Sequence, residues 1–193
     1  RRQRQMCIRD SIMTEEQLTK GLQAGDNLAR KELYERLAGQ MLSLCRRYVG
    51  QSDEAEDLLH DGFLQIFSQI GKFTWRGEGT LAAWVRRVMT NHVLSALEKE
   101  KRLATDDIDE VPDMGADDND APPDISTDVI MQLIAELPTG YRTVLNLFLV
   151  EGWSHAEIAE KLNIKESTSA SQYLRAKKLL KDKILNYINL NDL

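Results

Sequence analysis

Apolar residues recur at every third or fourth position through most of this chain, a spacing typical of amphipathic helices that bury one face. The first half of the pattern predicts helices over about 14–24, 28–49, 53–70 and 80–99. The second half predicts helices over about 128–136, 139–150, 155–162 and 166–187. No alternation of useful length predicts a strand, so we expect an all-α protein.

The segment from Tyr141 to Lys183 has the order of a helix-turn-helix. An apolar helix ends at Glu151–Gly152, and the next helix begins after Ser154, which has capping-box spacing to Glu157. Asn163 then occupies a turn position that usually needs a positive φ, which Asn tolerates well. Such a motif places its second helix in a DNA major groove. An ordinary αα-hairpin with a solvated polar face is the alternative.

The last helix has two faces of different character. Its expected inward stripe consists of Tyr173, Ala176, Leu180, Ile184 and Tyr187. Its expected outward face carries Thr168, Ser171, Gln172, Arg175 and Lys178. Side chains of these polar types can donate to phosphates and read base edges, which favours DNA binding by this face.

A loop over 73–79 precedes the fourth helix and combines aromatic and cationic side chains. The residues of interest are Phe73, Trp75 and Arg76 in the loop, and Arg86, Arg87 and Asn91 in the helix. An aromatic ring beside cationic groups suits the stacking of an unpaired base. The alternative is structural, with the aromatics capping the helical bundle and the arginines in water.

The polar face of the third helix carries Asp57, His60, Asp61 and Gln65. An acidic face of this kind can meet a basic protein surface, or it can simply be solvated. His60–Asp61 also resembles the dyad of helical metal-dependent phosphohydrolases, but the upstream histidine that such a site needs is absent. We therefore expect no metal, no cofactor and no catalytic residue.

Charge is distributed unevenly along the chain. The formal net charge is −6, but ten of the 31 acidic residues lie between 104 and 128, where no basic residue occurs. Without these ten, the chain has 21 acidic and 25 basic residues, so the remainder is mildly basic. Three prolines and like charges predict that 103–127 is an acidic disordered linker, either a passive tether or a nucleic-acid mimic.

The linker divides the chain into two small helical domains, over 14–102 and 128–193, and 1–13 are expected to be an arm or an added remnant. Cys7 and Cys45 form no CxxC pair, and Cys45 lies on an apolar helix face, which indicates a reducing, cytoplasmic setting. No apolar run approaches the roughly 18 residues that span a bilayer, so no membrane insertion is expected.

Four stretches carry a family resemblance when they are taken in order. They are A-E-D-L-L-H-D-G-F-L-Q-I-F from 55, F-T-W-R-G-E-G-T-L-A-A-W-V-R-R-V-M-T-N-H from 73, L-P-T-G-Y-R-T-V-L from 137, and E-G-W-S-H-A-E-I-A-E-K-L-N-I-K-E-S-T from 151. Together they resemble the extracytoplasmic-function sigma factors of bacterial RNA polymerase over about residues 18–183.

The resemblance implies a function without chemistry of its own. A sigma factor binds core RNA polymerase, directs it to promoters and helps to open the −10 element, and an anti-sigma factor is a further expected partner. The first domain would be region two, docking on the β′ clamp through Asp57, His60, Asp61 and Gln65. The second domain would be region four, which reads the −35 element as duplex DNA.

The resemblance also assigns nucleic-acid contacts. Those expected at the −10 element are Trp75, Arg76, Arg86, Arg87 and Asn91. Those expected at the −35 element are Ser167, Thr168, Ser171, Gln172, Arg175 and Lys178. The recognition helix departs from the family pattern, with Ser169 in place of an apolar anchor and Ala170 and Gln172 in place of arginines. A helix-turn-helix regulator that acts without polymerase is the alternative function.

Overall fold

The computed structural model describes residues 13–50, 52–99 and 125–191. Regular structure within these residues is helical throughout, without a strand. The helices are α1 (Glu15–Gln23), α2 (Asn27–Val49), α3 (Ser52–Gln69) with the 3-10 turn η1 (Ile70–Lys72), α4 (Thr80–Lys99), α5 (Thr127–Ala135), α6 (Thr139–Leu149), α7 (His155–Leu162) and α8 (Glu166–Asn191). The all-α prediction is confirmed, whereas nearly all of the predicted arm and linker lies outside the described residues.

Several helix ends adopt the local structure that their residues predict. Ser154 and Glu157 form a reciprocal capping box at the start of α7. Asn163 ends that helix in the left-handed conformation, with φ 54° and ψ 45°. Gly50 ends α2 in the same conformation, with φ 77°. The prediction for α8 was too short, because the helix runs on to Asn191.

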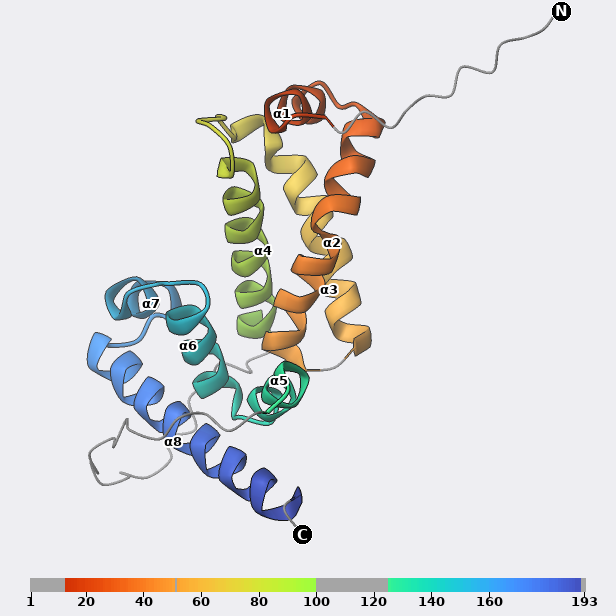
Figure 1. Cartoon of the computed structure of the whole chain (residues 1–193). Coiled ribbons are helices and arrows are strands. Elements are labelled where there is room, and N and C mark those ends of the chain that lie inside the picture. Colours follow the sequence, from red (N-terminus) through yellow and green to blue (C-terminus); the bar gives the residue numbers. More distant parts are fainter. Residues whose placement is uncertain (1–12, 51, 100–124, 192–193) are drawn as a thin grey trace, which may run out of the picture.

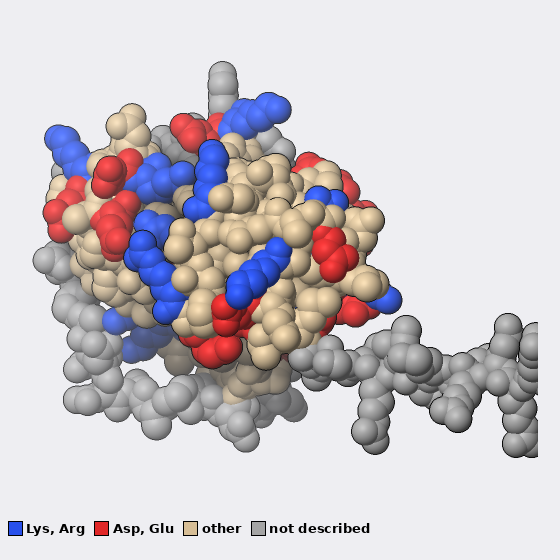
Figure 2. Space-filling model, turned by 90° about the horizontal axis from the view of Figure 1, so that it is seen from above, with Lys and Arg blue, Asp and Glu red and all other residues tan. Residues whose placement is uncertain are grey.

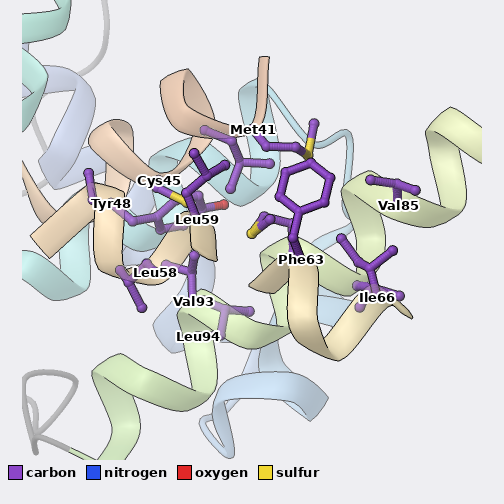
Figure 3. Close-up of a cluster of buried hydrophobic side chains, with 14 of the residues drawn as sticks. Met41, Cys45, Tyr48, Leu58, Leu59, Phe63, Ile66, Val85, Val93 and Leu94 are labelled. Atoms are coloured by element: carbon purple, nitrogen blue, oxygen red, sulfur yellow. The ribbon is translucent and has the colours of Figure 1, made fainter. Parts of the chain in front are cut away.

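Helices α1–α4 bury a continuous apolar core, part of which is drawn in Figure 3. Cys45 and Tyr48 from α2 pack there with Phe63 from α3. Burial raises the pKa of the Cys45 thiol to about 12, which is consistent with the predicted core role. Gly62 allows α3 and α4 to approach closely, because a Cβ at this position would lie only 2.3 Å from the Met89 sulfur.

Helices α5–α8 form a smaller unit, in which α8 packs against α5, α6 and α7. Its own buried cluster is small and consists of Leu137, Leu145 and Ala176. Three other buried residues of this unit, Val144, Leu147 and Ile158, belong to the core of the first unit instead. The second unit therefore shares its hydrophobic burial with the first.

The two units are in direct contact at the end of the bundle opposite α1 (Figure 1). Helix α2 packs against both α5 and α6. The amide nitrogen of Asn146 in α6, which is 1% exposed, donates to the backbone carbonyl of Arg47 in α2 over 3.0 Å. This hydrogen bond, made by a buried donor, helps to fix the position of α6 on α2.

An ion-pair cluster between the units, here called the Glu151 clasp, consists of Glu151, Arg47 and Arg86. The Glu151 side chain is only 4% exposed. Its carboxylate accepts from Arg47 Nη2 at 3.2 Å and from Arg86 Nε at 2.6 Å. A second bond from Arg86 Nη2, at 3.1 Å, makes the contact with Arg86 bidentate. A buried carboxylate must be paired in this way, because its desolvation is costly.

We predict that Glu151→Gln loosens the contact between the two units. The change leaves two arginines facing a neutral amide, and loss of one partner from a buried pair is strongly destabilising. The Arg86 side chain is 43% exposed, so water screens part of its charge. We therefore expect the free energy of unfolding to fall by only about 2 kcal/mol. Small-angle X-ray scattering should show a larger radius of gyration, and the melting temperature should fall.

The matched control is Glu160→Gln, which makes the same change at an exposed position of α7. This variant should leave both measurements as in the original chain. Identical scattering and melting of the two variants would show that the clasp does not hold the units together.

Candidate nucleic-acid interface

The helix-turn-helix is built from α7, the turn at Asn163 and α8. Hydrogen bonds from the backbone and hydroxyl of Ser154 hold the Glu157 carboxylate and lower the pKa of that carboxyl. Ile164 donates its backbone N–H to the carbonyl of Ala159 over 3.0 Å, which closes the turn. Ile158 and Ala159 are buried, so α7 is anchored and the start of α8 is presented outward.

The predicted outward face of α8 is mostly accessible. Ser167 and Lys178 are exposed, and Thr168, Ser171 and Arg175 are half-buried. The predicted outward placement of Gln172 is wrong, because this residue is only 6% exposed. Successive α-helical residues are about 100° apart, so the buried stripe that includes Ala176 also takes in Gln172. Gln172 therefore does not lie on the outward face.

Ser169, where an apolar anchor was expected from the family pattern, is fully buried. Its hydroxyl lies 3.0 Å from Nδ1 of His155 at the start of α7. The His155 ring stacks on Phe148, with ring centroids 4.4 Å apart. A polar pair thus takes the place of an apolar contact between the two helices of the motif, and the serine does not disrupt their packing.

The loop over 73–79 connects η1 to α4. Phe73 is buried and packs 5.2 Å from Trp84, measured between ring centroids, so it is a core residue and not an accessible aromatic. Trp84 itself is half-buried. Trp75 is half-buried against the core, while Arg76 is exposed. The indole N–H of Trp75 is buried without a hydrogen-bond partner. Of the two loop aromatics, Trp75 is therefore the one available to a ligand.

The arginines of α4 face the second unit. Arg86 belongs to the Glu151 clasp, and its hydrogen bond to Glu151 raises the pKa of the guanidinium. The Arg87 guanidinium lies 5.3 Å from the ring centroid of Trp153, a cation–π geometry. Asn91, further along the helix, is half-buried. Sequence reasoning identified the arginines but missed their partners, because no spacing rule connects residues about 65 positions apart.

The acidic face of α3 is accessible at three of its four predicted positions. Asp57, His60 and Asp61 are exposed. Gln65 is half-buried, and its side-chain oxygen lies 2.8 Å from Nδ1 of His92 in α4. That distance to an amide oxygen places the Nδ1 proton on His92. Part of Gln65 is therefore engaged within the bundle.

Charge is mixed on the face seen from the α1 end of the molecule. Figure 2 shows Lys and Arg side chains gathered in a band between acidic patches, with a large uncharged area beside it. Nucleic-acid contacts on this face would therefore be local and not the result of one extended positive field.

Among the described residues, no helix is both long and apolar enough to cross a membrane, and no three potential metal ligands cluster.

Comparison with known proteins identifies both units. Residues 33–103 match the family model of Sigma-70 region 2, and residues 127–180 match that of Sigma-70, region 4. The ECF RNA polymerase sigma-E factor of Haemophilus influenzae is 28% identical over 184 residues, covering 89% of this chain and 96% of the relative. The ECF RNA polymerase sigma factor SigW of Bacillus subtilis is 26% identical over 177 residues, covering 86% and 94%.

Among solved structures, the chain is similar to the sigma factor RpoE of Bartonella quintana, which was crystallised with the anti-sigma factor NepR. The TM-score is 0.50 at 18% sequence identity, and the alignment covers 81% of this chain and 96% of that one. At this level of identity the likeness concerns the fold.

We predict that His92 makes the stability of the bundle depend on pH. Burial lowers the pKa of His92 below its usual 6.5, against the opposing charge of Asp61. The buried Nε2 has no acceptor for a second proton. The unfolded chain then binds more protons than the folded chain, so stability is full above about pH 6.5 and declines as the pH falls through the folded pKa.

Thermal melting between pH 7.5 and 5 measures this effect. His92→Gln should reduce the decline, whereas His60→Gln, at an exposed position, should retain it. An equal decline in all three proteins would assign the pH dependence to other groups.

Proposed function

We infer that this chain, which belongs to the extracytoplasmic-function sigma factors of bacterial RNA polymerase, selects promoters by holding two DNA elements with two separate helical units. The observation that carries the inference is the presence of regions 2 and 4 in that order in one chain, with a helix-turn-helix whose recognition face is accessible. In this scheme the protein catalyses no reaction, and it acts in the cytoplasm, where the polymerase works.

The acidic face of α3 serves as the docking surface for core polymerase. Asp57, His60 and Asp61 project from neighbouring turns of one helix and are all exposed. Complementary charge speeds association and fixes orientation, and this face would meet a basic surface on the β′ clamp. Gln65 contributes through the part of its side chain that His92 does not engage.

Recognition of the −35 element depends on the start of α8. Ser167, Thr168 and Ser171 lie in its first two turns, and Arg175 and Lys178 follow on the same side. Hydroxyl groups can read base edges, whereas the cationic side chains position the helix on phosphates. We exclude Gln172 from this set because it is buried.

Capture of an unpaired base at the −10 element depends on Trp75 and Arg76, with Asn91 nearby on α4. Stacking on an aromatic ring is worth roughly 1–3 kcal/mol per base. One such contact can bias the melting of a promoter but cannot drive it alone. The polymerase supplies the remainder, and the phosphates of the opened strand would be met by Arg86 and Arg87.

In the described arrangement, the two units lie too close together to contact both promoter elements at once. The −10 and −35 elements are about 25 base pairs apart, or about 85 Å of duplex at about 3.4 Å per base pair. Arg87 of α4 lies 5.3 Å from the Trp153 ring, two residues before α7, and at about 1.5 Å per residue α4 spans only about 30 Å and α8 only about 39 Å. Promoter binding therefore requires the units to separate, which frees Arg86 and Arg87 from Glu151 and Trp153. An anti-sigma factor that binds both units would oppose this separation.

Reconstitution with sigma-free core polymerase tests the function. The chain should co-purify with the core enzyme and should confer specific start sites on a library of promoter-length DNA fragments. Start sites indistinguishable from those of core enzyme alone would contradict the proposal. Tight operator binding by the free chain would then favour the polymerase-independent regulator.

We predict that Trp75→Ala impairs promoter opening more than promoter binding. Loss of the stacking contact should reduce the open complex about tenfold or more. Permanganate reactivity of unpaired thymines measures opening, and a footprint over the −35 element measures closed-complex formation, which should change less than about twofold. Thr74→Ala, at the exposed neighbouring position, is the control. Equal losses in both assays would remove Trp75 from the pocket.

We predict that Asp61→Arg impairs binding to core polymerase while the bundle stays folded. The substitution places a positive charge on an exposed face that is proposed to meet a basic surface, so repulsion should weaken binding at least about tenfold. Glu98→Arg makes the same charge change at an exposed position of α4. Equal affinities of the two variants, measured by fluorescence anisotropy, would exclude this face from the interface.

A further inference from the structure

The loop over 73–79 lies beside α1 at one end of the bundle (Figure 1). Two of its glycines have positive φ values, 127° at Gly77 and 84° at Gly79. Glycine leaves such a segment many alternative conformations unless other contacts select one. Gly79 directly precedes α4, so the helix lacks a side chain at the position that usually caps its first N–H groups.

Glu15 of α1 supplies the missing cap from the other end of the sequence. Its carboxylate accepts the backbone N–H of Gly79 at 2.7 Å and that of Leu81 at 2.7 Å, one with each oxygen. Hydrogen bonds to an ionised acceptor are stronger than neutral ones. A negative charge is also favourable at a helix N-terminus, where the peptide dipoles present their positive end.

Gln23, at the other end of α1, holds the start of the same loop. Its side-chain nitrogen donates to the carbonyl of Phe73 over 2.7 Å. Between these two residues, Leu18 and Leu22 anchor α1 in the core with exposures of 1% and 2%. Helix α1 thus forms a brace, defined here as Glu15 and Gln23, that holds both ends of the loop while Trp75 lies between the two contacts.

We propose that Glu15 and Gln23 are positioning residues for base capture, which set the orientation of Trp75 and so determine the base preference at the −10 element. This proposal rests on the proposed function of the loop. Neither residue contacts DNA in this scheme, because both side chains are directed to the backbone of the loop. Helix α1 precedes residues 33–103, the segment that matches region 2.

A brace that merely stabilises the bundle would change the melting temperature and nothing else. A positioning brace must also move Trp75 and alter discrimination between bases. The test therefore needs a local signal from Trp75 and a readout of base preference. The first is ¹⁹F NMR of the full chain labelled with 5-fluorotryptophan, whose resonances are assigned with Trp→Phe variants at its three tryptophans.

The variants are Glu15→Ala, Glu15→Gln and Gln23→Ala. Glu15→Gln keeps the size of the side chain and one acceptor oxygen, so it decides the question if Glu15→Ala fails to fold. The matched control is Glu16→Gln in the same turn of α1, where the native carboxylate pairs with Lys20 over 2.7 Å and the side chain is 46% exposed. The Trp75 resonance should shift in the three brace variants and stay in place in the control, while the Trp153 resonance stays in place throughout.

The second readout is transcription by holoenzyme from a promoter library that is randomised across the −10 element and sequenced by its transcripts. Loss of a charge-assisted hydrogen bond corresponds to about a tenfold change in equilibrium, so Glu15→Ala should reduce discrimination at the captured base about tenfold. Glu15→Gln should have a smaller effect, which is the partial rescue expected of a conservative change. Preferences at the −35 element should not change.

Trp75→Ala in the same library separates the two proposals. If it abolishes the preference while the Glu15 and Gln23 variants keep that of the original chain, the positioning proposal is overturned and base capture stands. A shifted Trp75 resonance with unchanged preference overturns it in the same way. If Trp75→Ala itself keeps the preference, the loop does not capture a base, and both proposals fall.

Discussion

The burial of one carboxylate constrains how the two halves of this protein meet. The Glu151 side chain is 4% exposed, and a charge so far from water is tolerated only with cationic partners at hydrogen-bond distance. Those partners, Arg47 and Arg86, come from two different helices of the first unit. The second unit can therefore close on the first only in a pose that satisfies all three groups. Because Arg86 is also a proposed DNA contact, the closed pose and promoter binding compete for one guanidinium.

The two ends of the helical bundle make different contacts. At one end, the second unit docks through apolar residues such as Val144 and Leu147 together with the Glu151 clasp. At the other end, Glu15 and Gln23 hold the loop that contains Trp75. Both ends use polar contacts between segments that are distant in sequence. Such contacts orient groups better than apolar burial does, because hydrogen bonds are directional and hydrophobic burial is not.

Buried polar pairs also explain how this chain departs from the family pattern without losing the fold. Ser169 stands where an apolar anchor is usual, yet its hydroxyl lies 3.0 Å from His155, so the group is not left unpaired. Gln172 stands where an arginine is usual, and it is buried at the helix interface, with an exposure of 6%. Of the residues proposed to contact the −35 element, Arg175 and Lys178 are therefore the two that carry a charge.

The sequence by itself determined what depends on neighbours along the chain. Most helix bounds, the capping box at Ser154 and the left-handed turn at Asn163 follow from residue type and spacing, which act over a few positions. Tertiary structure alone decided which polar residues meet: Glu151 with Arg86, Glu15 with Gly79, and Gln172 with the interior of its own unit. Periodicity reports which side of a helix is apolar. It carries no information about which residue of another helix lies opposite, because that depends on the packing of the whole chain.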